Sequence, residues 1–223
     1  MSLKVALDYS LRSLLRFPGP PVKEGSPLDA RVANEVGQFL RGFLEVVAQV
    51  RPTPTVLDVG AKNFYLAPVL DAFFRRQGCD PAIHGVEVDA YRRYSSFRTR
   101  RQYGDFYAAQ ISRGTYHAQD FLTLSLDCDV IFLLNPFVSI EPLHAWGLPK
   151  RLFRPDALFE HAAHCLSLRG GVLICSSPNE EELKTVTAFA TRLGLRERLR
   201  HSWHPAHASI QRQPRLGVAF QSG

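Results

Sequence analysis

Near-continuous apolar runs alternate along this chain with segments in which apolar residues recur every three or four positions. The runs predict buried strands at 55–60, 82–88, 128–134 and 170–176. The segments with helical spacing predict helices at 28–47, 63–74, 155–168 and 180–193. This alternation is typical of an α/β domain built on a mostly parallel sheet.

The pattern changes after Gly194. Residues 195–203 and 215–221 have the character of two strands, and no helix long enough for a parallel crossover lies between them. A shorter strand is expected at 115–118. The sheet is therefore predicted to finish in a C-terminal antiparallel hairpin.

The N-terminal part of the chain is organised differently. A short amphipathic piece at 7–17 is followed by the proline-rich breaks 18–21 and 25–27, and only then does the first long helix begin. We therefore predict two parts, a helical lid or brace over 1–50 and the α/β domain over 51–223.

Composition narrows the class of protein. The 223 residues are 45% hydrophobic, enough to bury a full core, and no stretch approaches the roughly eighteen apolar residues that a membrane span needs. The four cysteines, at 79, 128, 165 and 175, are widely spaced and form no C-x-x-C pair, which fits a reducing compartment. We expect a cytoplasmic protein that does not associate with membranes.

The chain is basic, with a net charge of +6 and a pI near 9.3. Its densest basic stretch runs from Arg92 to Arg101, where arginines alternate with tyrosine and phenylalanine. Such a stretch suits an RNA surface, because arginine pairs with phosphates while aromatic rings stack on bases. It is equally typical of a solvated surface, so RNA is one candidate partner and a small molecule is the other.

Polar residues gather at the ends of the predicted strands. They are Asp58 and Gly60, Glu87, Asp120, and Asn135. Ligands of an open α/β sheet bind outside the carboxyl ends of its strands, so we expect these residues to share one site. Glu87 is suited to a ribose diol, since an ionised acceptor binds hydroxyl donors more strongly than a neutral one.

From Thr55 to its C-terminus, this arrangement resembles the class I S-adenosylmethionine-dependent methyltransferase superfamily. The resemblance implies a Rossmann-like, mostly parallel sheet of seven strands with helices on both faces. It also implies S-adenosyl-L-methionine as cofactor and methyl transfer as the activity. The residues that would bind the cofactor are the first motif Asp58 and Gly60, the ribose acid Glu87, and the adenine contacts Asp120 and Phe121.

One stretch departs from the family pattern. Family members continue the first motif as acid-x-Gly-x-Gly-x-Gly, whereas Lys62 and Phe64 occupy the second and third glycine positions here. A side chain at these positions takes up space and disfavours positive φ. Lys62 is suited to pairing with the cofactor's carboxylate, but the same charge would repel its sulfonium. Both interpretations stay open.

The element after the fourth strand is the candidate catalytic one. Asn135, Pro136 and Phe137 resemble the Asn-Pro-Pro-aromatic element of enzymes that methylate planar amino nitrogens, with one proline fewer. The same three residues are also compatible with a simple strand-to-loop transition. The loop Phe137–Lys150, with Trp146, lies where a substrate pocket would open.

The most economical interpretation is an S-adenosylmethionine-dependent methyltransferase whose acceptor is a small molecule or RNA. The alternative is a non-catalytic protein of the same fold, which has lost cofactor binding and serves as an interaction module. No metal site is predicted, because Pro205 interrupts the series His201, His204 and His207. The sequence leaves the oligomeric state open.

Overall fold

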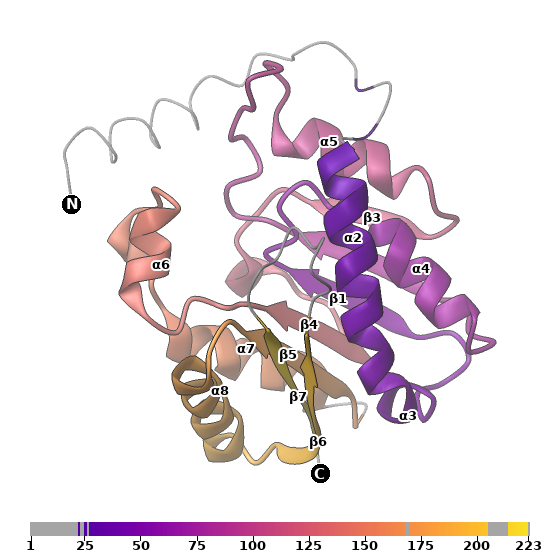
Figure 1. Ribbon diagram of the computed structural model, residues 1–223, viewed down its shortest axis with the longest axis vertical. Helices are drawn as coiled ribbons and strands as arrows, with labels where there is room; N and C mark the ends of the chain where they lie inside the picture. Colours follow the sequence, from indigo (N-terminus) through magenta and orange to yellow (C-terminus); the bar gives the residue numbers. More distant parts are fainter. Residues whose placement is uncertain (1–21, 23–24, 26, 168–169, 205–213, 223) are drawn as a thin grey trace.

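The computed structural model describes residues 22, 25, 27–167, 170–204 and 214–222 (Figure 1). The predicted piece 7–17, the break 18–21 and His207 lie outside the described residues. Within the described part, no helix is both long enough and apolar enough to cross a membrane.

Seven strands form one sheet in the order β3-β2-β1-β4-β5-β7-β6. Their bounds are β1 Thr55–Val59, β2 Ala82–Val86, β3 Gly114–His117, β4 Val130–Leu134, β5 Val172–Ser177, β6 Arg196–Trp203 and β7 Arg215–Gln221. The first five strands pair in parallel, and β7 runs antiparallel to both β5 and β6. The predicted α/β class and C-terminal hairpin are confirmed.

Helices connect the parallel strands. The α-helices are α2 Pro27–Leu40, α3 Leu44–Val47, α4 Ala67–Arg75, α5 Arg100–Ala108, α6 Ile140–Ala145, α7 Pro155–Ser167 and α8 Glu180–Arg192. Three 3₁₀ turns accompany them, η1 Arg41–Phe43, η2 Phe121–Thr123 and η3 Lys150–Leu152. The single long helix predicted at 28–47 is divided by η1. The segment 137–150, predicted as a loop, contains α6, whose six residues are too few to show helical spacing.

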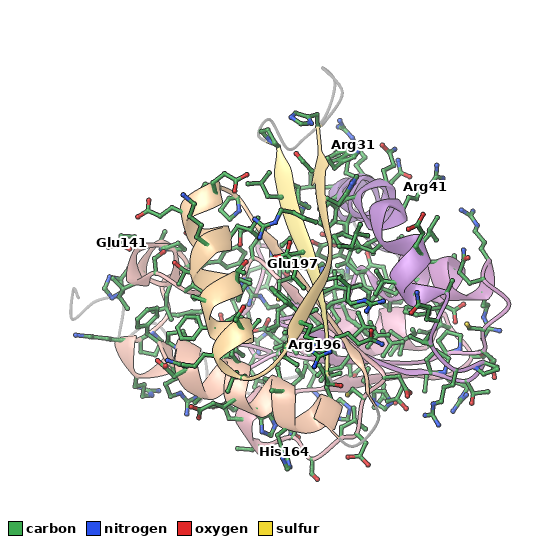
Figure 2. All side chains as sticks on the ribbon, turned by 90° about the horizontal axis from the view of Figure 1, so that it is seen from below. Arg31, Arg41, Glu141, His164, Arg196 and Glu197 are labelled. Carbon is green, nitrogen blue, oxygen red and sulfur yellow. The ribbon has the colours of Figure 1, made fainter. Side chains whose placement is uncertain are left out.

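The two faces of the sheet carry separate apolar cores, because side chains alternate along each strand. Val56 and Phe132 belong to the core under α2, α3, α4 and α5, whereas Leu57 and Ile131 belong to the core under α7 and α8. In Figure 2, Arg31 and Arg41 mark the α2 side of the sheet and His164 marks the α7 side. The three-layer arrangement leaves the carboxyl ends of the strands as the open edge.

The helix α2 belongs to the core that contains Val56 and Phe132. Phe39 and Leu40 of α2 are fully buried in the cluster that also contains strand residues of β1 and β4. Gly217 of β7 permits the approach, because a Cβ there would lie 2.4 Å from the Phe39 ring. The division of the chain at residue 50 into a lid and a domain stays a prediction.

Candidate functional site

A cavity of about 380 Å³ opens at the carboxyl ends of β1, β2 and β4. Its lining includes eight of the nine residues predicted from the sequence for the cofactor and for catalysis: Gly60, Lys62, Glu87, Asp120, Phe121, Asn135, Pro136 and Phe137. The ninth, Asp58, is buried in β1 and does not line the cavity. The structure therefore brings together residues from four separate strand ends.

The loop after β1 has a left-handed backbone at three alternate positions. The φ values are 73° at Gly60, 53° at Lys62 and 61° at Phe64. A non-glycine residue in this conformation costs roughly 1–2 kcal/mol. The loop thus adopts at Lys62 and Phe64 the backbone conformation that glycine would favour, although the glycines themselves are absent.

Phe64 is accommodated by a glycine on the neighbouring strand. Its side chain is fully buried, and a Cβ built on Gly85 of β2 would lie 2.5 Å from the Phe64 ring. On the sequence side, the signal for this contact is a lone glycine inside a predicted strand, which often marks a close approach. Sequence reasoning did not use that signal.

The same loop is tied to the first helix. The buried side-chain amide of Asn63 donates a hydrogen bond to Asp29 Oδ2 of α2, over 2.8 Å. Burial raises the pKa of Asp29, an effect that the Asn63 bond opposes. This contact joins residues 34 positions apart, and nothing local in the sequence indicates it.

Asp58 lies beneath the loop with 2% of its surface exposed. Burial, reinforced by the nearby Glu87 carboxylate, raises the pKa of Asp58 to about 7. Within the described residues, its Oδ2 atom has no hydrogen-bond partner. Asp58 therefore lies close enough to Glu87 for the charges of the two carboxylates to interact.

Glu87 is the most heavily engaged carboxylate of the site. Its Oε2 accepts the Lys62 backbone N–H over 2.9 Å, and its Oε1 accepts the Asp89 N–H over 2.7 Å. Arg100 Nη1 lies 3.4 Å from Oε1 and 3.5 Å from Asp89 Oδ2. Since a carboxylate accepts about four hydrogen bonds, roughly one position is left for a ligand hydroxyl. Burial raises the pKa of Glu87, and the Arg100 charge opposes that rise.

Arg100 was predicted as part of a basic surface and is instead 5% exposed, at the cavity. Other arginines of that stretch are held by the chain itself. Arg92 pairs with Asp89 and donates to the Trp146 carbonyl over 2.7 Å, and Arg101 donates to the Tyr91 hydroxyl over 2.8 Å. Part of the stretch is thus used for internal contacts.

Lys62 carries its ammonium into the cavity. The Nζ atom lies 4.4 Å from the centroid of the Trp146 ring, and the guanidinium carbon of Arg100 lies 5.6 Å from the same centroid. Burial lowers the pKa of Lys62. Within the described residues, this ammonium forms no ion pair, so its partner beside the cavity is an aromatic face.

Asp120 has two structural contacts. Its Oδ1 accepts the Leu122 N–H over 3.1 Å as the cap of η2, and its Oδ2 pairs with Arg154. Phe121 is buried edge-on against His161, with ring centroids 4.6 Å apart. Arg154, which the sequence did not single out, therefore belongs to the site.

Asn135 is held by the next strand. It has a φ of 56°, its N–H donates to the Ser176 carbonyl over 3.0 Å, and its Oδ1 accepts the Ser176 hydroxyl over 3.1 Å. Arg215 of β7 lies 3.4 Å from that hydroxyl oxygen. One lone pair of the Asn135 amide oxygen is therefore already in use.

His201, the first of the three spaced histidines, has a packing role. His201 packs against the Phe39 and Phe43 rings, with centroids 5.8 Å away in each case. In the described ranges, no group of three or more His, Cys, Asp or Glu side chains is arranged to hold a metal ion.

Solved structures resemble the chain over nearly its whole length. The magnesium protoporphyrin IX methyltransferase of Synechocystis PCC 6803, solved with bound S-adenosylmethionine, superimposes with a TM-score of 0.58 at 14% identity, covering 99% of this chain and 96% of that one. A candidate RNA methyltransferase of Pyrococcus horikoshii gives 0.59 at 13% identity, covering 100% and 99%. A methyltransferase of Aquifex aeolicus that depends on S-adenosylmethionine gives 0.54 at 15%, covering 97% and 99%.

No protein-family model matches the sequence, and no curated protein matches it significantly. The structural matches show that the chain has the fold of class I S-adenosylmethionine-dependent methyltransferases.

Proposed function

We propose that the cavity binds S-adenosyl-L-methionine and that the protein transfers the cofactor's methyl group to an acceptor. The observation that carries this proposal is the convergence of Gly60, Glu87, Asp120 and Phe121 on one cavity at the carboxyl ends of the strands. Its volume of about 380 Å³ lies in the range of small-molecule sites, roughly 300–1,000 Å³.

The residues present fit the cofactor. The Phe121 ring would pack on the adenine, and Asp120 would accept from its amino group. The remaining acceptor position of Glu87 would take a ribose hydroxyl, and the Lys62 ammonium would pair with the amino-acid carboxylate. When bound, the cofactor supplies an electrophilic methyl group on a sulfonium.

Asn135, Pro136 and Phe137 are the proposed catalytic element. They line the same cavity, and Ser176 fixes the Asn135 amide from the neighbouring strand. Methyl transfer needs above all an acceptor atom held in line about 3 Å from the methyl carbon. These residues would supply that placement by packing and hydrogen bonding.

We propose a small molecule as the acceptor. Apolar residues of α6 and α7 form the cavity wall next to the catalytic element, and several arginines that would bind phosphates are held by the chain. An RNA acceptor predicts instead that RNA affinity falls steeply with salt and weakens when Arg98 and Arg101 become alanine.

A second function has its own support. Two cations, Lys62 and Arg100, line the cavity that would receive a sulfonium, and Arg100 engages the proposed ribose acid. Repulsion between these cations and the sulfonium would prevent cofactor binding, and the protein would then act as an interaction module.

Calorimetric titration with S-adenosylmethionine separates the two functions, because this ligand carries the sulfonium that the two cations would repel and S-adenosylhomocysteine does not. The first function predicts a Kd in the micromolar range, and the second predicts no heat of binding at millimolar ligand. The variant Lys62→Met keeps the length of the side chain and removes the charge. Because a hydrogen bond to a charged group contributes about 1.5–3 kcal/mol, the variant should weaken binding roughly 10- to 150-fold.

The exposed Lys150 of η3 does not line the cavity, so Lys150→Met is the matched control and should bind like the wild type. Tighter binding by Lys62→Met, which keeps the length of the side chain, would show that the Lys62 charge opposes cofactor binding.

A further inference from the structure

The part of the cavity wall that runs from α6 to α8 is apolar except for two charged residues, Arg154 and Glu182. Beyond the residues proposed for the cofactor and for catalysis, the wall is contributed by η3, α7 and the segments around α6 and after β5. These residues are Pro142, Leu143, Trp146, Leu148, Leu152 and Leu158, with Pro155 and Pro178. Glu182 of α8 lines the same cavity. A site of this kind favours an apolar ligand with one polar group.

Glu182 is anchored from two directions. Its backbone N–H donates to the Asn179 side chain over 2.8 Å in the first turn of α8, which fixes the residue's place on the helix. Its Oε1 accepts the Ser139 hydroxyl over 3.1 Å, from the residue that precedes α6. The Ser139 bond therefore fixes the Glu182 carboxylate beside the cavity as a hydrogen-bond acceptor.

The charges around the cavity leave Glu182 without a cation. Arg100 pairs with Glu87 and Asp89, Arg154 pairs with Asp120, and the Lys62 ammonium faces the Trp146 ring. Within the described residues Glu182 forms no ion pair, and the Ser139 hydroxyl uses only one of its acceptor positions. A ligand that donates an N–H to Glu182 would occupy one of its remaining acceptor positions, whereas a carboxylate or phosphate group beside Glu182 would be repelled.

We propose that the acceptor site takes a small apolar amine, whose nitrogen donates to the Glu182 carboxylate while its hydrocarbon part packs on the walls of α6 and α7. This assignment rests on the proposed function, because it names the class of molecule that would be methylated. The nitrogen lone pair would form a bond to the methyl carbon as the carbon–sulfur bond breaks, and the N–H proton would pass to the Glu182 carboxylate. It makes Glu182 a specificity-determining residue.

The test compares two ligands of similar shape and opposite charge, 2-phenylethylamine and 3-phenylpropionate, by calorimetry with and without saturating S-adenosylhomocysteine. We expect the amine to bind at least tenfold more tightly than the acid. Glu182→Gln should weaken amine binding at least tenfold. Glu181→Gln, an exposed neighbour on the same turn that does not line the cavity, should change it less than twofold.

Tighter binding of the acid, equal binding of both, binding of neither, or equal loss in the two glutamate variants overturns the assignment. Ser139→Ala gives a second measurement should Glu182→Gln fail to fold, with at least a threefold loss of amine binding expected. The failure of the proposed function has a different signature. S-adenosylmethionine would then not bind the wild type, whereas the amine preference and its loss in Glu182→Gln would persist.

Discussion

The contact between Phe64 and Gly85 accounts for how the loop after β1 accommodates a phenylalanine, and a double-mutant cycle tests it. The perturbation is Gly85→Ala. The added Cβ would lie 2.5 Å from the Phe64 ring, and the ring is fully buried with Tyr116 beside it, centroids 5.9 Å apart. Overpacking of this kind costs about 1–3 kcal/mol.

The loss of stability caused by Gly85→Ala should depend on the presence of the Phe64 ring. Phe64→Ala alone should lose about 3–5 kcal/mol through the cavity that it leaves. In that background the methyl group added at position 85 enters empty space, so Gly85→Ala should cost close to nothing. The coupling energy is therefore expected at about 1–3 kcal/mol.

Denaturant unfolding of the four proteins measures this coupling, provided that the slope m stays the same. An equal cost of Gly85→Ala in both backgrounds would refute the account of the loop. It would mean that the strand adjusts and that the ring does not need the glycine.

Two further predictions concern the buried charges of the site. Asp58 has a folded pKa of about 7 against an unfolded value near 3.9, so the folded carboxyl holds a proton that the unfolded one releases. The unfolding free energy of the wild type relative to Asp58→Asn should therefore fall as pH rises from about 4 to about 7, and it should level off above pH 7. Denaturant titrations across this pH range measure the difference, and a difference that rises or stays constant contradicts the expected buried, protonated Asp58. Arg100→Met should cost about 3–5 kcal/mol, because it leaves the buried Glu87 carboxylate without its cation, whereas Asp89 keeps Arg92. Adding Glu87→Gln should recover part of that loss, and a cost under about 1 kcal/mol for Arg100→Met alone would show that the pair is not a buried one.

The strands were predictable because each buried run has its own local signal. Val130–Leu134 is apolar at every position, as a central strand covered on both faces must be. The helix α5 was missed because its buried side consists of Arg100 and Gly104 together with Tyr107 and Ala108, a set with little apolar periodicity. A capping box formed by Thr99 and Gln102 marks its start and was the available signal.

The positions of the candidate site residues at the strand ends follow from the sheet topology. The side chains that contact those residues do not. Glu87 and Asp120 were predictable because strand ends of a parallel sheet meet at one edge. Arg100, Arg154 and Glu182 were missed, because each enters the cavity from a helix or a helix-flanking turn whose placement depends on tertiary packing. The left-handed backbone at Lys62 is similarly a consequence of contacts far away in the sequence.

The proposed function requires S-adenosylmethionine to bind in this cavity. A crystal structure of the protein with S-adenosylhomocysteine would show whether the site takes the cofactor. We expect the adenine against Phe121, a ribose hydroxyl on Glu87 and the amino-acid carboxylate beside the Lys62 ammonium. Two features of crystals grown at millimolar ligand would contradict the proposed function. The Lys62 and Trp146 side chains would still be in contact, and no ligand would lie between Glu87 and Asp120.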